Sequence, residues 1–170
     1  TDWNAINKDE TNPMVNRAIS AYAPGSTYKI PIALAGMRAG LEDKSFPCYG
    51  GVQYGDKYMR CWIAEKKRIH GKLSLEDAIK VSCNAFFYQF GNVAGIEQID
   101  AMGNMLGLGQ KSGIPVSGES PGVLPGPEWL NSVNPRARWS NGLTANTAIG
   151  QGDVLASPLQ MAVIARSEEH

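Results

Sequence analysis

Glycine and proline recur at short intervals along this chain. Because both residues interrupt regular secondary structure, they limit the length of any helix or strand. The 170 residues include 19 glycines and 10 prolines, which fall between stretches whose apolar residues recur at helical spacing. The sequence contains no convincing run of long strands. We therefore expect a single mainly α domain, in which short helices alternate with loops, with enough residues to bury a core.

The glycines, prolines and apolar patterns divide the chain into six segments. Within the third segment, "GVQY" and "KYMRCW" are typical of two short strands that pair as a hairpin. The expected segments are an extended lead-in (1–24), a helix (25–40), a loop with a hairpin (41–72), helices joined by a short loop (73–109), a loop-rich part (110–156) and a terminal helix (157–170).

Side-chain capping patterns support two of the expected helices. Ser74 is a suitable N-cap with Asp77 three residues later, which is a weak version of the capping box. Ser157, Pro158 and Gln160 form a complete pattern of N-cap, first-turn proline and capping glutamine. These residues predict helix starts near residues 75 and 158.

The charge balance excludes several classes of partner. The chain has 16 basic and 16 acidic residues and a formal net charge of zero, whereas nucleic acids and anionic membrane surfaces favour basic patches. No apolar run approaches the roughly 18 residues of a spanning helix, and the first ten residues are too polar for a signal peptide. We expect a soluble chain whose targeting element was removed or belongs to a longer parent.

Ser26 and Lys29, in "AYAPGSTYKI", are the first candidates for catalysis. Residues three apart lie on one face of a helix, so the lysine can reach the serine hydroxyl. Serine needs an adjacent base to act as a nucleophile, and a lysine whose pKa is lowered by burial can be that base. Taken alone, the pair is more typical of a capping serine beside a solvated lysine, because Ser-x-x-Lys occurs often by chance.

The sequence Ser82-Cys83-Asn84 follows Ser26 by 56 residues and falls between two expected helices. A serine hydroxyl at such a loop can relay a proton, and an asparagine amide can hold a substrate carbonyl. Ser-x-x-Lys followed by Ser-x-Asn is a much more specific signal than either motif alone, because the two belong to one set of catalytic motifs in serine acyl-transfer enzymes.

Three cysteines and one internal histidine form a separate group: Cys48, Cys61, His70 and Cys83. Three thiolates and an imidazole are a complete tetrahedral zinc set, although the spacings of 13, 9 and 13 residues are not those of a zinc finger. Two alternatives stay open on the residues alone. One is a disulfide between Cys48 and Cys61 in an oxidising compartment, with Cys83 free, and the other is three free thiols.

Across residues 16–165 the chain resembles the transpeptidase domain of class B penicillin-binding proteins, most closely the penicillin-binding protein 2 group. The stretches that carry the resemblance are "NRAISAYAPGSTYKI", "RCWIAEKKRIHGKLSLEDAIKVSCNAFFYQFG", "LGLGQKSGIPVSGESPGVLPGPEW" and "TAIGQGDVLASPLQMA". The resemblance implies the penicillin-binding protein and serine β-lactamase-like fold. This chain would be its helical subdomain, with the five-stranded sheet largely absent.

The resemblance also implies roles for individual residues. Ser26 would be the acylated nucleophile, Lys29 its base, Ser82 the proton relay, and Asn84 the group that binds the substrate amide. Gln151 and Gly152 of "IGQG" fall where the family lines its active site. Members of the penicillin-binding protein 2 group also look able to hold zinc at the positions of the Cys and His group. Zinc would then be structural, positioning Ser82 and Asn84 without taking part in the chemistry.

The third family motif, Lys-Thr-Gly or Lys-Ser-Gly, is where this sequence departs from the pattern. Lys111-Ser112-Gly113 has the right residues, but it lies only 27 residues past Asn84 and before "IGQG". We interpret it as a decoy and expect the true motif beyond residue 165. The chain would therefore be a truncated fragment that lacks one wall of the active site.

The expected function is that of a peptidoglycan D,D-transpeptidase, which forms a serine acyl-enzyme and is acylated by β-lactams. Its partners would be stem peptides and a glycosyltransferase of the elongation machinery, with no nucleic acid. The parent would be anchored in the cytoplasmic membrane and face the periplasm. A serine β-lactamase or penicillin sensor, and a non-catalytic zinc-stapled helical scaffold, are the alternatives.

Overall fold

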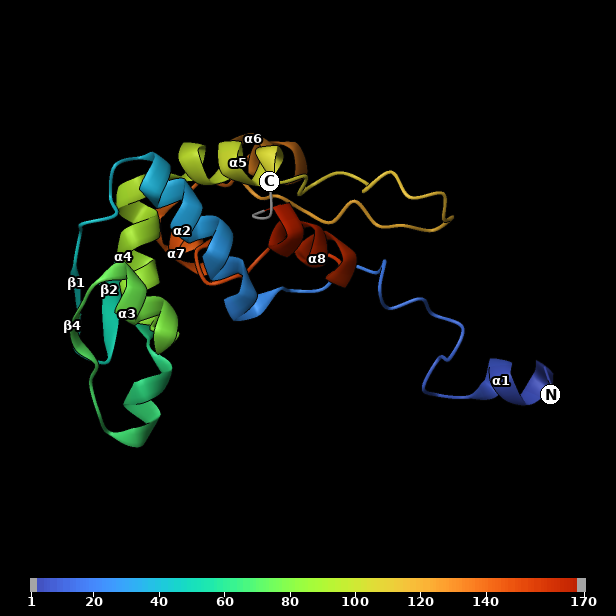
Figure 1. Ribbon diagram of the computed structural model, residues 1–170, viewed down its shortest axis with the longest axis horizontal. Coiled ribbons are helices and arrows are strands. Elements are labelled where there is room, and N and C mark those ends of the chain that lie inside the picture. The colour runs from blue at the N-terminus through green and yellow to red at the C-terminus, as the bar shows by residue number, and fades with distance from the viewer. Residues whose placement is uncertain (1–2, 168–170) are drawn as a thin grey trace.

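A computed structural model describes residues 3–167 and places three helices at the centre of the protein. Helix α2 (Lys29–Arg38) packs against α4 (Asn84–Ala94) and α5 (Ile96–Met105), as Figure 1 shows. Phe86, Phe87 and Phe90 on α4 are fully buried, and their rings contact one another edge-on or stacked. A Cβ at Gly36 of α2 would overlap the Phe90 ring, so glycine permits the close crossing of these two helices.

Four short strands form two separate antiparallel pairs among the described residues. Strands β2 (Gly51–Tyr54) and β3 (Lys57–Arg60) make the hairpin that the sequence predicts, with Val52 opposite Met59. Strand β1 (Phe46–Cys48) pairs with β4 (Gly71–Leu73), with Cys48 opposite Gly71. This second pair joins segments that are more than twenty residues apart, and local sequence signals do not predict it.

The remaining elements lie outside these three central helices. They are α1 (Trp3–Lys8), the 3₁₀ turn η1 (Gly25–Tyr28), the 3₁₀ helix η2 (Trp62–Lys66), α3 (Leu75–Lys80), α6 (Pro127–Val133), α7 (Asn141–Thr147) and α8 (Pro158–Ser167). Helix α7 packs against α4. Single β-bridges join Tyr22 to Ala156 and Val123 to Leu155, which hold the lead-in and the long loop against the segment before α8.

The expected capping residues occupy the expected positions. The Ser74 hydroxyl accepts a hydrogen bond from the Asp77 N–H at the start of α3. At the start of α8, Ser157 Oγ accepts from the Gln160 N–H and Gln160 Oε1 accepts from the Ser157 N–H, which is the reciprocal capping box. Gly107 follows the end of α5 with φ of 79°, the left-handed conformation that commonly ends a helix.

Two sequence predictions of local structure need correction, and a third gains two helices. Residues 1–24 are not extended throughout, because α1 forms one short helix within them, set apart from the core in Figure 1. Residues 110–156 are largely loop, and they also contain α6 and α7, which the sequence did not predict. The helix at 25–40 begins as a 3₁₀ turn and ends at Arg38. Helix α7, "NGLTANT", has few strong helix formers, and its packing against α4 stabilises it. The last three residues of the predicted terminal helix lie outside the described residues.

Within residues 3–167, no helix combines the length and the apolar character that crossing a membrane requires.

Candidate active site

Three of the four predicted catalytic residues contact the amine of the fourth, Lys29. Lys29 Nζ lies 3.1 Å from Ser26 Oγ, 2.9 Å from Ser82 Oγ and 2.7 Å from Asn84 Oδ1. It also donates to the Ser82 carbonyl oxygen at 2.9 Å, and Ser82 Oγ donates to Ser26 Oγ at 3.0 Å. The distances place the predicted nucleophile, base and relay within direct proton-transfer reach of one another.

Burial makes Lys29 suitable as a base. Its side chain is only 2% exposed, and this burial lowers the lysine pKa to about 8, since removal from water disfavours the charged amine. The neutral fraction at pH 7 is then roughly one in ten, against about one in several thousand for an ordinary lysine. Ser26 itself is exposed, so the predicted nucleophile is accessible from solvent while the predicted base is buried.

The backbone of Gly25, directly before Ser26, is in close contact with the backbone of Gly150. Gly25 adopts φ of 58° immediately before Ser26, and Gly150 adopts φ of 70°, a region that favours glycine. The Gly25 N–H donates to the Gly150 carbonyl oxygen at 2.9 Å. The "IGQG" segment therefore contacts the turn that carries Ser26, and sequence reasoning did not single out Gly150 for this contact.

Replacing Gly150 with alanine should distort the nucleophile turn. A Cβ there would overlap the Gly25 carbonyl oxygen, and alanine is strained at this positive φ, so we expect the free energy of unfolding to fall by about 2–4 kcal/mol. Chemical denaturation measures the change. Gly142→Ala in helix α7 is the control, since the nearest atom to its added Cβ is 3.8 Å away, and it should leave stability unchanged or raise it slightly. Equal stabilities of the two variants would contradict this.

Gln151 and Gly152, the predicted substrate-binding residues, are both exposed. The Gln151 N–H donates to the Asn146 carbonyl oxygen, and a Cβ at Gly152 would lie 3.3 Å from Asn146 Cβ. Their described contacts are therefore with α7, while Gly150 makes the approach to the Ser26 turn. A role for these two residues in binding substrate stays a prediction.

Ser82 reaches the site from the tight connection between α3 and α4. It adopts φ of 50°, which is uncommon for a residue other than glycine. Its N–H donates to the Ile79 carbonyl oxygen, and the Cys83 N–H donates to the Ala78 carbonyl oxygen. Cys83 Sγ in turn accepts the Phe86 N–H at the start of α4. Folding of the two helices therefore directs Ser82 and Asn84 toward Lys29.

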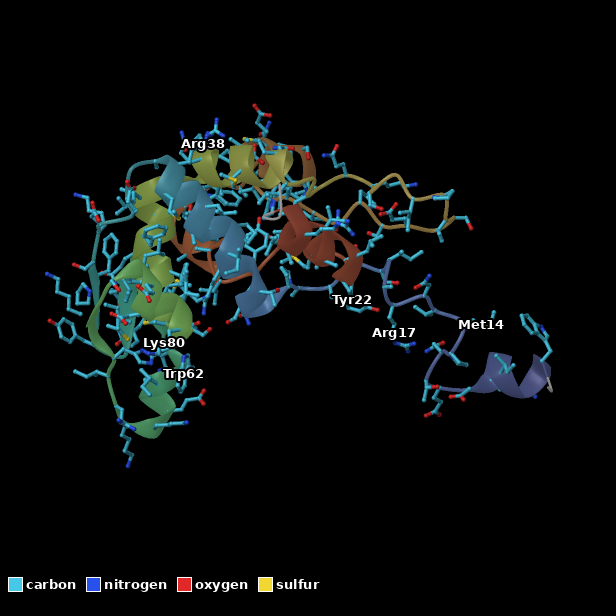
Figure 2. The ribbon with its side chains drawn as sticks, viewed as in Figure 1. Met14, Arg17, Tyr22, Arg38, Trp62 and Lys80 are labelled. Atoms are coloured by element: carbon cyan, nitrogen blue, oxygen red, sulfur yellow. The ribbon has the colours of Figure 1, made fainter. Side chains whose placement is uncertain are left out.

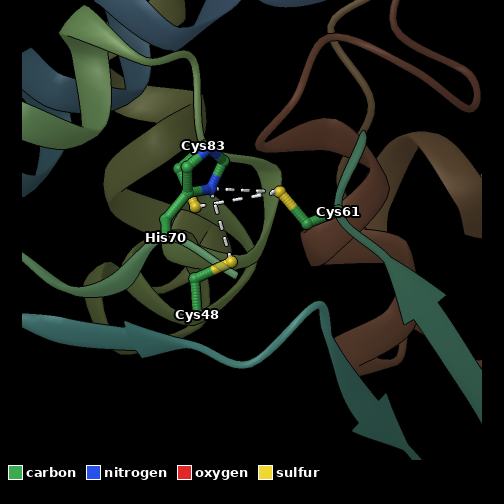
Figure 3. Close-up of side chains that lie close together, drawn as sticks. All are labelled: Cys48, Cys61, His70 and Cys83. Carbon is green, nitrogen blue, oxygen red and sulfur yellow. Dashed lines mark hydrogen bonds between the residues drawn. The ribbon is translucent and has the colours of Figure 1, made fainter. Parts of the chain in front are cut away.

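The three cysteines and His70 lie together, as Figure 3 shows. His70 Nδ1 is 3.5 Å from Cys48 Sγ and 3.7 Å from Cys61 Sγ, and Cys61 Sγ is 3.9 Å from Cys83 Sγ. Zinc with Zn–S bonds of about 2.3 Å and a Zn–N bond of about 2.0 Å gives ligand-to-ligand edges of roughly 3.5–3.8 Å. Three of the six distances are close to these edges, and all four ligand atoms lie within 4.8 Å of one another, so the donor set is the one that tetrahedral zinc prefers and is nearly at its spacing. The three thiols are free, and the alternative Cys48–Cys61 disulfide is absent.

Lys111-Ser112-Gly113 lies on the long loop between α5 and α6. The Ser112 N–H donates to the Glu119 carboxylate at 2.8 Å, a contact within that loop. Among the described residues, this tripeptide has no recorded hydrogen bond to the Ser26 group. Its interpretation as a decoy of the third motif stays a prediction.

Comparison with known proteins identifies the class. The family model described as the penicillin binding protein transpeptidase domain matches residues 2–167. A curated relative, the peptidoglycan D,D-transpeptidase MrdA of Acinetobacter baumannii, is 35% identical over 95% of this chain and 24% of its own length. The chain thus spans about a quarter of the length of the curated relatives it matches.

Two solved structures of penicillin-binding protein 2 have the same fold. One, from Helicobacter pylori in complex with MreC, superimposes with a TM-score of 0.85 and 33% identity, over 94% of this chain and 30% of the other. The second, from Pseudomonas aeruginosa in complex with WCK 5153, has a TM-score of 0.86 and 32% identity over 96% of this chain and 36% of the other. The chain belongs to the penicillin-binding protein transpeptidase domain family, and its curated relatives include the MrdA group.

Proposed function

We propose that this chain supplies the acylating centre of a peptidoglycan D,D-transpeptidase that cross-links the cell wall and is a target of β-lactams. The contact of the buried Lys29 amine with Ser26 Oγ, Ser82 Oγ and Asn84 Oδ1 carries the proposal. The name of the curated relatives, peptidoglycan D,D-transpeptidase, supports it.

The proposed reaction begins when Ser26 Oγ attacks the carbonyl carbon between the two terminal D-alanines and Lys29 Nζ accepts the serine proton. Ser82 Oγ relays that proton to the leaving amine as the peptide C–N bond breaks. An amine of a neighbouring stem peptide then attacks the Ser26 ester, and its proton returns through Lys29 to Ser26 Oγ. Asn84 Oδ1 faces Lys29, so its amide N–H₂ is left to donate to a substrate carbonyl.

We also propose that Cys48, Cys61, His70 and Cys83 hold one structural zinc ion. Four protein ligands leave no open position on the metal, so the ion would supply charge neutralisation and cross-linking but no acid–base chemistry. Cys83 lies between Ser82 and Asn84. The ligand set would therefore fasten Cys48 on β1 and Cys61 before η2 to the connection that carries Ser82 and Asn84.

The wider setting is proposed from the relatives. The similar Helicobacter pylori protein was solved in complex with MreC, and another structural neighbour is a peptidoglycan synthase complex. We infer similar partners of the elongation machinery for the protein that contains this chain, including a glycosyltransferase. A membrane anchor and a position facing the periplasm are part of the same proposal, as are the five-stranded sheet and third motif of the family fold.

A labelled penicillin tests the proposal in the full-length protein. We expect a stable covalent adduct on Ser26, located by peptide mass spectrometry and absent from Ser26→Ala. Because the base is neutral Lys29, with a pKa lowered by burial to about 8, the acylation rate should rise about tenfold from pH 6 to pH 7 and level off above about pH 8. A rate that is independent of pH from 6 to 9 would contradict the role of Lys29.

Other outcomes identify the alternatives. Rapid release of hydrolysed penicillin would favour a serine β-lactamase, and a slowly released adduct without cross-linking of stem peptides would favour a penicillin sensor. Complete absence of an adduct on folded, zinc-loaded protein would favour a non-catalytic zinc-stapled scaffold.

A further inference from the structure

Trp62 connects the cysteine and histidine group to the proposed catalytic connection. It follows Cys61 directly and begins the 3₁₀ helix η2. Figure 2 labels it close to Lys80, the last residue of α3. Its indole Nε1–H donates to the Ser82 carbonyl oxygen at 3.1 Å and lies 3.3 Å from the Val81 carbonyl oxygen. The tryptophan therefore contacts the backbone of the connection that presents Ser82.

The Ser82 carbonyl oxygen has two donors. One is the Trp62 indole, and the other is Lys29 Nζ at 2.9 Å. A carbonyl oxygen has two lone pairs, so both donors can bind at once and restrain the peptide group from two sides. Val81 and Ser82 follow the end of α3, where helix carbonyls lack partners inside the helix, and the indole satisfies carbonyls at this end.

Restraint matters here because Ser82 adopts φ of 50°. A residue other than glycine stays in this region only when its surroundings hold it there. The Trp62 indole N–H binds the carbonyl oxygen of Ser82 itself, and so restrains the residue that has this φ. If the donor is lost, the connection can relax, and Ser82 Oγ then moves relative to Ser26 Oγ and Lys29 Nζ.

The indole is itself fixed by two ring contacts. Its ring meets the His70 ring edge-on, with centroids 5.2 Å apart, and Lys66 Nζ lies 5.2 Å above it. Cys61, directly before it, and Met59, three residues before it, are buried. Trp62 is thus 37% exposed, but its one polar atom points inward to the Ser82 carbonyl oxygen. Its ring contacts His70, a proposed zinc ligand.

We infer that Trp62 is a positioning residue for acylation: its indole N–H holds the Ser82 peptide group so that Ser82 Oγ stays in contact with Ser26 and Lys29. This inference rests on the proposed transpeptidase function. Trp62 does not touch the reacting atoms, and it acts through Ser82.

The test compares Trp62→Phe with the wild type in the full-length protein. Phenylalanine keeps a ring beside His70 and Lys66 but removes the N–H donor. We expect the rate constant of penicillin acylation to fall by about three- to tenfold, which is the range for one lost hydrogen bond. The dissociation constant of the non-covalent penicillin complex and the zinc content should not change. Amide hydrogen exchange in the peptide that contains Ser82 and Cys83 should become faster.

Trp139→Phe is the matched control. Its indole N–H donates to Thr144 Oγ1 at 2.8 Å, so this variant also loses an indole hydrogen bond, but away from Ser82. It should leave both the acylation rate constant and exchange at Ser82 unchanged. An unchanged acylation rate constant in Trp62→Phe would overturn the inference. So would a decrease in that rate constant that is explained by an equal loss of bound zinc, or an equal decrease in Trp139→Phe. If the wild type forms no adduct, the proposed function fails, and the exchange measurement still decides whether Trp62 holds Ser82.

Discussion

Replacing Lys29 with methionine is expected to slow penicillin acylation of Ser26 by on the order of 10²- to 10⁴-fold, the range that a positioned general base contributes. Lys29 is the only side chain that contacts Ser26 Oγ, Ser82 Oγ and Asn84 Oδ1 together among the described residues. The serine would keep its accessible position but lose its proton acceptor. The rate of adduct formation with a labelled penicillin measures the effect.

The same substitution should leave the protein folded. Lys29 is almost fully buried, and its amine is partly desolvated, so a methionine of similar length fills the space without the cost of a buried charge. Thermal unfolding of Lys29→Met at or above the wild-type temperature would separate catalysis from folding. Lys44→Met, at an exposed position, is the control for loss of one positive charge. Acylation by Lys29→Met at a rate near that of the wild type would rule out the proposed base.

Of the predicted changes, removal of zinc is expected to lower the stability of the protein the most. If the cluster holds zinc and free zinc is about 1,000-fold above its dissociation constant, chelation should lower the free energy of unfolding by about 4 kcal/mol. Acylation should fall with it, because Cys83 lies between Ser82 and Asn84 and its Sγ also caps α4. Metal analysis of the purified protein, followed by denaturation with and without chelator under reducing conditions, checks this.

Cys83→Ala supplies the matched comparison for the chelator. The variant should bind zinc weakly, show a loosened connection at Ser82, and respond little to further chelation. Cys48→Ala removes a ligand that lies on β1, away from Ser82, and should reduce zinc binding with a smaller direct effect on the cap of α4. Normal acylation in wild-type protein that contains no zinc would disprove the structural role of the metal.

The sequence predicted the features that depend on near neighbours. The caps at Ser74 and at Ser157 with Gln160 are present, because a capping side chain only needs to reach the backbone two or three residues away. The β2–β3 hairpin was found for the same reason, since its strands are separated by a short turn. The three phenylalanines of α4 follow the same logic, because residues at this spacing share one face of a helix, and all three are buried.

Features that depend on distant contacts were not predicted. Helix α7 was missed because asparagine, glycine and threonine are poor helix formers, and packing against α4 outweighs that preference. Helix α1 was missed because six residues give too short a window for periodicity. The β1–β4 pair and the contact of Gly150 with Gly25 join remote segments, and one sequence alone carries no signal for such pairs.

For the proposed active site, the sequence by itself determined the chemical groups and the spacing of Ser26 and Lys29, since three residues along a helical turn fix that contact. It also supplied the complete donor set of Cys48, Cys61, His70 and Cys83. Only the tertiary structure decided that Lys29 is buried, which lowers its pKa, and that Ser82 and Asn84 meet it from more than fifty residues away. Burial and long-range proximity arise from the packing of α2, α3 and α4, and local sequence cannot specify packing between helices.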